Sequence, residues 1–208
     1  MIGFAGSPFT LACYLIQGKG SSNFDKPKQF LHRHPEAAEK LFTLLVDVVS
    51  KYLEAQVMAG ADAVQIFDSW GGILSQDDYR NWSARGVKEI FRRLKPLGVP
   101  RILFVNNVAP YLDIVADIDC EVIGVDYRCD LATASAALPH KSIQGNLDPA
   151  VMFGSQEGVI RQTKRILEHL DRHDNFIFNL GHGIQPGTPV LSVQTLVDTV
   201  HDFRRSVQ

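Results

Sequence analysis

The sequence predicts an α/β fold built from about six βα units around a parallel sheet, and two observations carry this prediction. Six short runs rich in β-branched and aromatic residues are apolar throughout rather than alternating, which is typical of strands buried on both faces. Segments with helical spacing separate these runs, and no linker or low-complexity stretch interrupts the alternation. The expected strands are Ile2–Ala5, Ala63–Phe67, Arg101–Val105, Glu121–Val125, Lys141–Gln144 and Phe176–Asn179.

Apolar spacing and capping residues define the expected helices. Pro35 opens a long helix that Gly60 ends, and Ser155 and Ser192 cap two later helices that run to about Leu170 and Arg205. Three further helices are expected over residues 76–94, 110–116 and 131–138. The apolar face of the long helix is expected to consist of Ala38, Leu41, Leu45, Val48, Tyr52, Leu53 and Val57.

Composition excludes several classes of protein. A formal net charge of −2 gives no basic field for nucleic acid. Cys13, Cys120 and Cys129 are too few, and too widely spaced, for a disulfide framework or a zinc knuckle, and they fit a reducing cytosol. No stretch approaches the ~20 apolar residues of a membrane span. The residues after Met1 lack the basic and apolar regions of a signal peptide.

Each expected strand is followed by polar residues that an apolar interior would not tolerate. Because parallel strands end at the same edge, these residues predict one shared site at the carboxyl face of a TIM-type barrel, here incomplete. Ser69, shortly before the pair Gly71-Gly72, and His182, between two glycines, are the strongest candidates for ligand contact. The polar groups in chain order are Ser7, Asp68, Ser69, Asn106, Asn107, Asp126, Arg128, Asn146, Asp148, Asn179 and His182.

Structural roles remain open for most of these residues. Asn146 and Asp148 precede Pro149 and could equally cap a helix. Asp126 could pair with Arg128. Asn106 and Asn107 fit a cap better than a ligand contact, and Tyr14, in an apolar helical stretch, taken alone fits the core.

Other motifs point away from nucleotide, metal and Schiff-base chemistry. Residues 18–22 lack the spacing of a phosphate loop and suit a surface loop or an active-site lid. His32 and His34 are expected in a solvated polar loop, and no lysine ends a strand run.

Four motifs in order resemble the uroporphyrinogen decarboxylase family. They are GFAGSPFTL at residues 3–11 with Tyr14 and GKGSS following, FDSWGG at 67–72, QGNLDP at 144–149 and NLGHG at 179–183. The resemblance implies a distorted (β/α)8 barrel and a cytoplasmic homodimer that works without cofactor or metal. It implies removal of CO2 from the four acetate side chains of uroporphyrinogen III, giving coproporphyrinogen III in haem biosynthesis.

The same resemblance implies roles for five residues. Tyr14, Ser69 and His182 fall on the family's substrate-contacting positions, and Phe4 and Phe67 fall on apolar residues that line the cleft. No catalytic residue is assigned with certainty, and His182 is a weaker candidate for proton transfer. No nucleic-acid or membrane partner is expected.

The sequence also departs from the family pattern. Family members carry an R-Q-A-G-R segment and a catalytic Asp before the region that matches, and neither is present here. We therefore expect residues 1–208 to form one barrel domain that lacks the first two strands, and we expect this chain alone to be inactive. Two alternatives are a corrinoid-dependent methyltransferase of the same superfamily, whose zinc-binding His-x-Cys pair is absent, and a non-catalytic remnant with exposed sheet edges.

Overall fold

The computed structural model describes residues 1–21, 23–168 and 175–203. Its strands agree with the predicted ones to within one residue at each end, except that the fifth strand ends three residues later than predicted. The strand order in the sheet is the chain order, which confirms the parallel α/β prediction. The chain divides into two compact units, Met1–Ile123 and Gly124–Gln208. The strands are β1 (Ile2–Gly6), β2 (Ala63–Asp68), β3 (Arg101–Val105), β4 (Val122–Val125), β5 (Ser142–Leu147) and β6 (Phe176–Leu180).

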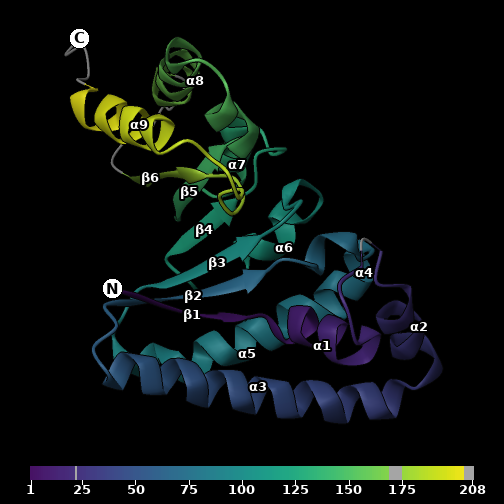
Figure 1. The fold of residues 1–208 in the computed structure, drawn as a ribbon. Coiled ribbons are helices and arrows are strands. Elements are labelled where there is room, and N and C mark those ends of the chain that lie inside the picture. The colour runs from purple at the N-terminus through teal and green to yellow at the C-terminus, as the bar shows by residue number, and fades with distance from the viewer. Residues whose placement is uncertain (22, 169–174, 204–208) are drawn as a thin grey trace. The chain divides into compact units, whose positions relative to one another are not determined.

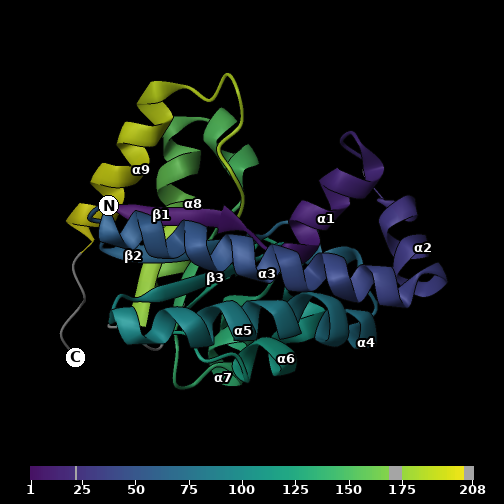
Figure 2. The same ribbon diagram turned by 90° about the horizontal axis from the view of Figure 1, so that it is seen from below.

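The first unit places long helices beside the parallel strands β1, β2 and β3. α3 packs against α5, α1 and β1, and α3 and α5 lie side by side in both views (Figures 1 and 2). Its helices are α1 (Pro8–Gln17), α2 (Asp25–Arg33), α3 (Pro35–Met58), α4 (Gln76–Asp78), α5 (Arg85–Leu94) and α6 (Leu112–Ala116). Shorter 3-10 turns span Gly71–Ile73, Lys95–Leu97 and Ala109–Tyr111.

Local sequence explains where α1 begins and ends. The Ser7 hydroxyl accepts a hydrogen bond from the Thr10 N–H at 3.0 Å, and Pro8 occupies the first helical position. Gly18 ends the helix in the left-handed conformation, at φ 75°. The following loop is described at residues 19–21 and 23, and residue 22 lies outside the described residues.

Residues Asp25–Arg33 form helix α2, which was not predicted. The expectation that His32 lies in a polar loop is therefore wrong. His32 lies in the last turn of this helix, 3.5 Å from the Asp78 carboxylate, and His34 follows the helix. Only two side chains of α2, Pro27 and Leu31, are buried, so the segment shows little apolar periodicity.

The segment predicted as one helix over residues 76–94 has two helical parts separated by a π-helical turn. α4 is capped by the Ser75 hydroxyl, and Tyr79–Ala84 form the π-helical turn before α5. Tyr79 and Ser83 in this turn are fully buried. The turn therefore carries two polar side chains into the interior of the first unit.

Two residues predicted for the buried face of α3 lie on its outer side. Val48 is 51% exposed and Tyr52 is 58% exposed. The core-facing residues are Ala38, Phe42, Leu45, Val46, Val49, Ser50 and Leu53. The helix carries apolar residues on more than one face, so periodicity alone selected a stripe turned partly toward solvent.

The second unit pairs β5 with β6 and packs α8 against α9 (Figure 1). Ser155 caps α8 as predicted, since its hydroxyl accepts from the Gly158 N–H at 3.2 Å. The predicted Ser192 cap is wrong, because α9 begins two residues earlier and Ser192 is buried in its first turn. The predicted ends at Leu170 and Arg205 lie outside the described residues. The α-helices of this unit are α7 (Leu131–Ala137), α8 (Gln156–Glu168) and α9 (Val190–Asp202), and a 3-10 turn spans Pro149–Phe153.

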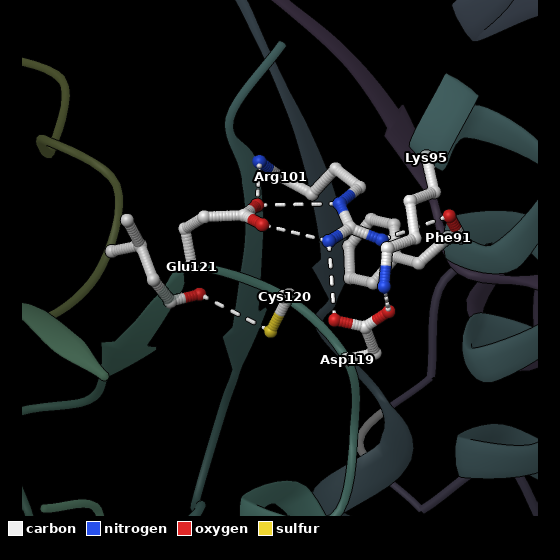
Figure 3. Close-up of polar contacts among 7 residues, drawn as sticks. Phe91, Lys95, Arg101, Asp119, Cys120 and Glu121 are labelled. Carbon is white, nitrogen blue, oxygen red and sulfur yellow. Dashed lines mark hydrogen bonds and ion pairs between the residues drawn. The ribbon is translucent and has the colours of Figure 1, made fainter. Parts of the chain in front are cut away.

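An ion network around the buried Arg101 side chain holds the amino end of β3 (Figure 3). The Arg101 side chain is only 3% exposed. Its guanidinium donates to the Glu121 carboxylate at 2.7 and 3.2 Å, to Asp119 at 3.3 Å and to the Phe91 carbonyl at 3.0 Å. Lys95 binds Asp119 from the solvent side at 2.8 Å. Because this network lies at the amino end of its strand, we interpret it as structural.

No helix in the described part of the chain combines the length and the apolar character needed to cross a membrane.

Candidate functional site

A buried carboxylate joins the carboxyl ends of the first two strands. Asp68 ends β2 and is fully buried. It accepts hydrogen bonds from the Ser83 hydroxyl at 2.5 Å, the Ser7 hydroxyl at 2.7 Å, the Gly71 N–H at 3.1 Å and the Thr10 hydroxyl at 3.4 Å. Burial raises the pKa of this carboxyl above its ordinary value, and these hydrogen bonds oppose the shift. Asp68 therefore ties together β1, β2, α1 and the π-helical turn.

Sequence reasoning listed Asp68 as a polar strand end but missed this structural role. The available signal was an apolar strand that ends on an acid and is followed, two residues later, by Gly71 and Gly72. A Cβ on Gly71 would lie 2.2 Å from the Asp68 carboxylate, and one on Gly72 would lie 2.0 Å from the Asn106 carbonyl oxygen. Both glycines are thus required by close packing of the loop after β2.

Tyr14 is held at the surface of the first unit by aromatic neighbours. The Trp70 indole N–H donates to the Tyr14 hydroxyl oxygen at 3.0 Å, and the ring meets Phe24 edge-on at 5.7 Å. Tyr14 is 47% exposed, so the alternative that it belongs to the core is wrong. Because the phenol accepts this bond, it keeps its own proton to donate to a ligand.

Ser69 lies half-buried between Asp68 and Trp70, on the loop that leaves β2. Its carbonyl accepts from the Asn106 side-chain amide at 3.3 Å. Asn107, in the left-handed region at φ 60°, donates in the same way to the Gly72 carbonyl at 3.1 Å. Both side chains thus fix the loop that carries Ser69. The predicted cap is wrong, because the N-cap position of the following 3-10 turn is Val108 and no side chain caps it.

Three aromatic rings form a row across β1, β2 and β3. Phe4 meets Phe67 edge-on at a centroid distance of 5.9 Å, and Phe67 meets Phe104 at 5.8 Å. Phe4 is 60% exposed. The structure therefore brings the two predicted cleft residues, Phe4 and Phe67, together on one apolar surface.

His182 belongs to the second unit, where it follows β6 and is exposed. The Gly181 N–H donates to the Leu147 carbonyl at 2.7 Å. A Cβ on Gly181 would lie 2.3 Å from the Tyr127 nitrogen, whereas a Cβ on Gly183 would meet open space. Close backbone approach thus explains the first glycine of the NLGHG motif but not the second.

Replacement of Gly181 should therefore be far more costly than replacement of Gly183. We expect Gly181→Ala to lower the free energy of unfolding by about 2–3 kcal/mol, because the Tyr127 backbone must move. Gly183→Ala, the matched control, should stay within about 1 kcal/mol of the parent protein. Urea unfolding followed by circular dichroism measures both, and equal effects would contradict this interpretation.

The polar residues at the carboxyl ends of β4 and β5 make hydrogen bonds within the second unit. Buried Asp126 accepts from the Arg128 N–H at 3.0 Å and from its guanidinium at 3.4 Å, as the structural alternative predicted. The Asn146 amide donates to the carbonyls of Asp126 and Cys129 at 3.1 and 2.6 Å, so it is not a cap. Asp148 does cap the turn after β5, accepting from the Ala150 N–H at 2.9 Å.

The cysteines are all free and buried. Burial raises the pKa of Cys13 to about 12 and that of Cys129 to about 11, so both remain protonated at neutral pH. Within residues 1–21, 23–168 and 175–203, no group of three or more His, Cys, Asp or Glu side chains could hold a metal ion.

Comparison with known proteins places these motifs in a family. The family model described as uroporphyrinogen decarboxylase (URO-D) matches residues 1–203. A uroporphyrinogen decarboxylase of Acidovorax sp. is 39% identical over all of this chain and 61% of its own length, and that of Carboxydothermus hydrogenoformans is 43% identical over 98% and 58%. A methyltransferase from Methanosarcina mazei superposes with a TM-score of 0.82 at 21% identity, over 97% of this chain and 58% of its own, and shows the fold alone.

The chain spans about three fifths of the length of the curated relatives it matches. The family model covers residues 1–203, and the Acidovorax relative aligns with the whole chain. The chain belongs to the uroporphyrinogen decarboxylase family.

Proposed function

We propose that a protein carrying this sequence decarboxylates the four acetate side chains of uroporphyrinogen III, giving coproporphyrinogen III for haem and porphyrin biosynthesis. The observation that carries the proposal is the group of side chains at the carboxyl ends of β1 and β2. An exposed phenol, Tyr14, and the Ser69 loop lie in the same unit as the row formed by Phe4, Phe67 and Phe104. By the resemblance, Tyr14 and Ser69 fall on the family's substrate-contacting positions and Phe4 and Phe67 on its cleft-lining positions, whereas Phe104 is added from the ring contacts alone.

The chemistry suits a site without a cofactor. Protonation of a pyrrole ring at the α-carbon next to the one that bears the acetate creates a cation conjugated with the acetate-bearing carbon. The electron pair released when the carboxylate leaves as CO2 forms an exocyclic C=CH2 bond, and protonation of this methylene with loss of the added ring proton gives the methyl group of the product. The substrate itself thus supplies the electron sink, and the protein needs only to hold the ring, deliver a proton and desolvate one carboxylate.

Each site residue then has a role in binding. The row formed by Phe4, Phe67 and Phe104 excludes water from one face of the tetrapyrrole. Tyr14 and Ser69 donate hydrogen bonds to a substrate carboxylate. His182 binds another polar group of the substrate and is a weaker candidate for proton delivery.

Removal of the Tyr14 hydroxyl should lower the catalytic efficiency without unfolding the protein. We expect Tyr14→Phe to lower kcat/KM for uroporphyrinogen about tenfold, because one hydrogen bond to a charged group is lost. Tyr52→Phe is the matched control, since Tyr52 is an exposed tyrosine of α3 in the same unit. Equal kinetics for the two variants would show that Tyr14 does not contact the substrate.

The remaining features of the family complete the proposal. We propose a cytoplasmic homodimer that binds tetrapyrrole and needs neither nucleic acid nor membrane. Residues 1–208 expressed alone are expected to be inactive, because the arginine-rich segment and the catalytic Asp of the family are not among them. The methyltransferase alternative requires a His-x-Cys zinc pair that the sequence lacks.

Anaerobic incubation with uroporphyrinogen III tests the proposal. The longest reading frame that contains this sequence and the 208-residue chain are assayed in parallel, with chromatography of the oxidised porphyrins. Coproporphyrin from the longer product supports the activity, and its absence refutes it. Activity of the 208-residue chain alone would overturn the expectation that it is inactive. Stoichiometric zinc, measured by metal analysis, would revive the methyltransferase alternative.

A further inference from the structure

Trp70, on the loop that leaves β2, binds α1 at two points. Its backbone N–H donates to the Thr10 hydroxyl oxygen at 3.3 Å, and its indole N–H donates to the Tyr14 hydroxyl oxygen at 3.0 Å. Thr10 and Tyr14 are four residues apart on α1 and so lie on one face of the helix. The loop is thus fixed to that face through both its main chain and a side chain.

The indole of Trp70 sets the direction of its hydrogen bond to Tyr14. An indole nitrogen can only donate, whereas a phenol can both donate its proton and accept a hydrogen bond. Trp70 must therefore be the donor, and the Tyr14 oxygen must be the acceptor. A histidine, serine or amide side chain in this place could accept the phenolic proton and withdraw it from a ligand. Tryptophan leaves that proton with Tyr14.

Phe24 packs against both partners of this bond. Its ring centroid lies 4.5 Å from that of Trp70 and 5.7 Å from that of Tyr14. The residue is fully buried, and its backbone lies in the left-handed region at φ 47° and ψ 51°. A residue other than glycine is strained in this region, so the packing of the ring must outweigh that strain. The indole therefore cannot turn away from Tyr14 without disturbing its contact with Phe24.

We propose that Trp70 is a positioning residue for the carboxylate contact of the tetrapyrrole site, and this inference rests on the proposed function. Trp70 holds the Tyr14 hydroxyl in place and reserves its proton for a substrate carboxylate. It does not itself donate to the substrate, because its one side-chain proton is already bound by Tyr14. Since Trp70 directly follows Ser69, one loop carries one of the two carboxylate contacts and orients the other.

Proton–nitrogen NMR of the indole groups tests the hydrogen bond itself. The product of the longest reading frame that contains this sequence is labelled with 15N, and the Trp70 signal is identified by its loss in Trp70→Phe. We expect Tyr14→Phe to move the Trp70 signal and to leave that of Trp82, which packs on Phe42, in place. Tyr52→Phe, at an exposed tyrosine of α3, is the matched control and should move neither signal. A Trp70 signal that does not respond to Tyr14→Phe would show that the bond does not form.

An isosteric replacement separates the hydrogen bond from the packing of the ring. In Trp70→benzothienylalanine, introduced by nonsense suppression, sulfur takes the place of the indole N–H group while the shape of the ring is kept. We expect this variant to raise KM for uroporphyrinogen roughly fivefold with kcat nearly unchanged, because Tyr14 is less well oriented in the ground state and the transition state alike. The same replacement at Trp82 should leave KM unchanged. Tryptophan inserted at position 70 by the same suppression should restore the parent value.

A double-mutant cycle shows whether Trp70 acts through Tyr14. In a Tyr14→Phe background, Trp70→benzothienylalanine should have no further effect on KM, because the acceptor and the reserved proton are already gone. An increase of the same size in that background would show a general effect on the loop and would overturn the proposal.

The outcomes also separate this inference from the proposed function. A KM that responds to Tyr14→Phe but not to Trp70→benzothienylalanine would overturn the inference alone. A wild-type protein without decarboxylase activity would contradict the proposed function and the role of Trp70 in it, whereas the indole signals would still decide whether the hydrogen bond forms.

Discussion

Arg101→Ala should lower the free energy of unfolding by about 3–5 kcal/mol, the largest loss that we expect from a single side chain in this protein. The substitution removes a guanidinium that is 3% exposed, together with its bonds to Glu121, Asp119 and the Phe91 carbonyl. Glu121 and Asp119 are about half exposed or more and can regain water, whereas the Phe91 carbonyl is left inside with a cavity beside it. Urea unfolding measures the loss.

Lys95→Ala is the control for the same network. Lys95 and Asp119 are both more than half exposed, so removing this pair should cost less than about 1 kcal/mol. Arg101→Lys should lie between the two, because an ammonium cannot reproduce the planar fork that binds Glu121 and Asp119. Equal losses for Arg101→Ala and Lys95→Ala would contradict the view that burial makes this network important.

The pH dependence of the network has a defined sign. Burial acts to raise the pKa of Glu121, but the hydrogen bonds from Arg101 outweigh it, so the pKa falls below the ordinary 4.5. A lowered folded-state pKa contributes stability above the unfolded value and loses it as pH falls through the folded value. The stability difference between wild type and Arg101→Ala should therefore shrink as pH falls below about 4.5.

Asp68→Ala should lower the free energy of unfolding by about 3–4 kcal/mol. The carboxylate accepts four hydrogen bonds in a fully buried position. Without it the Ser7 and Ser83 hydroxyls can turn to other partners, but the Gly71 N–H is fixed by the backbone and remains unpaired. The loop that carries Ser69 and Trp70 should loosen, so binding of tetrapyrrole should weaken as well. Thermal unfolding and substrate titration measure the two effects.

Asp68→Asn separates shape from charge at this position. It keeps one acceptor oxygen and should cost less than Asp68→Ala. Burial raises the pKa of Asp68, so ionisation of the carboxyl lowers stability as pH rises from the ordinary value of 3.8 through the folded-state value. The stability advantage of wild type over Asp68→Asn should therefore be greatest in acid and decline with rising pH. An advantage that grows with pH would show that the hydrogen bonds outweigh burial.

Strand prediction succeeded where a strand is a short apolar run with a clear boundary, as in β2, β3 and β4. The predicted end of β5 at Gln144 is wrong, because Gly145 and Asn146 continue the strand to Leu147 without being apolar, and β6 has no buried residue although it was predicted to be buried on both faces. Helix α2 was missed because only Pro27 and Leu31 are buried, so no apolar period marks it. The face of α3 was misassigned at Val48 and Tyr52 because apolar residues occur on more than one side of that helix. Periodicity gives the type of an element reliably, but it does not say which of two apolar stripes meets the core.

For the site, too, the sequence predicted individual residues but not the neighbours that they contact in the fold. The motifs placed Tyr14 and Ser69, and the structure adds the neighbours that orient them, Trp70 and Asn106. The hydrogen-bonding role of Asp68 could not be predicted from the sequence. Its partner Ser83 lies in a π-helical turn, and the sequence pattern predicted a regular helix there. Contacts between segments far apart in the chain depend on packing that a single sequence does not encode locally.

The most direct test of the central claim is the number of CO2 molecules released per tetrapyrrole by protein dialysed against a metal chelator. The experiment uses the longest reading frame containing this sequence and uroporphyrinogen III under anaerobic conditions. We expect four CO2 per tetrapyrrole and conversion of the eight-carboxylate substrate to a four-carboxylate product, with no added cofactor. Recovery of the eight-carboxylate substrate with no CO2 would contradict it.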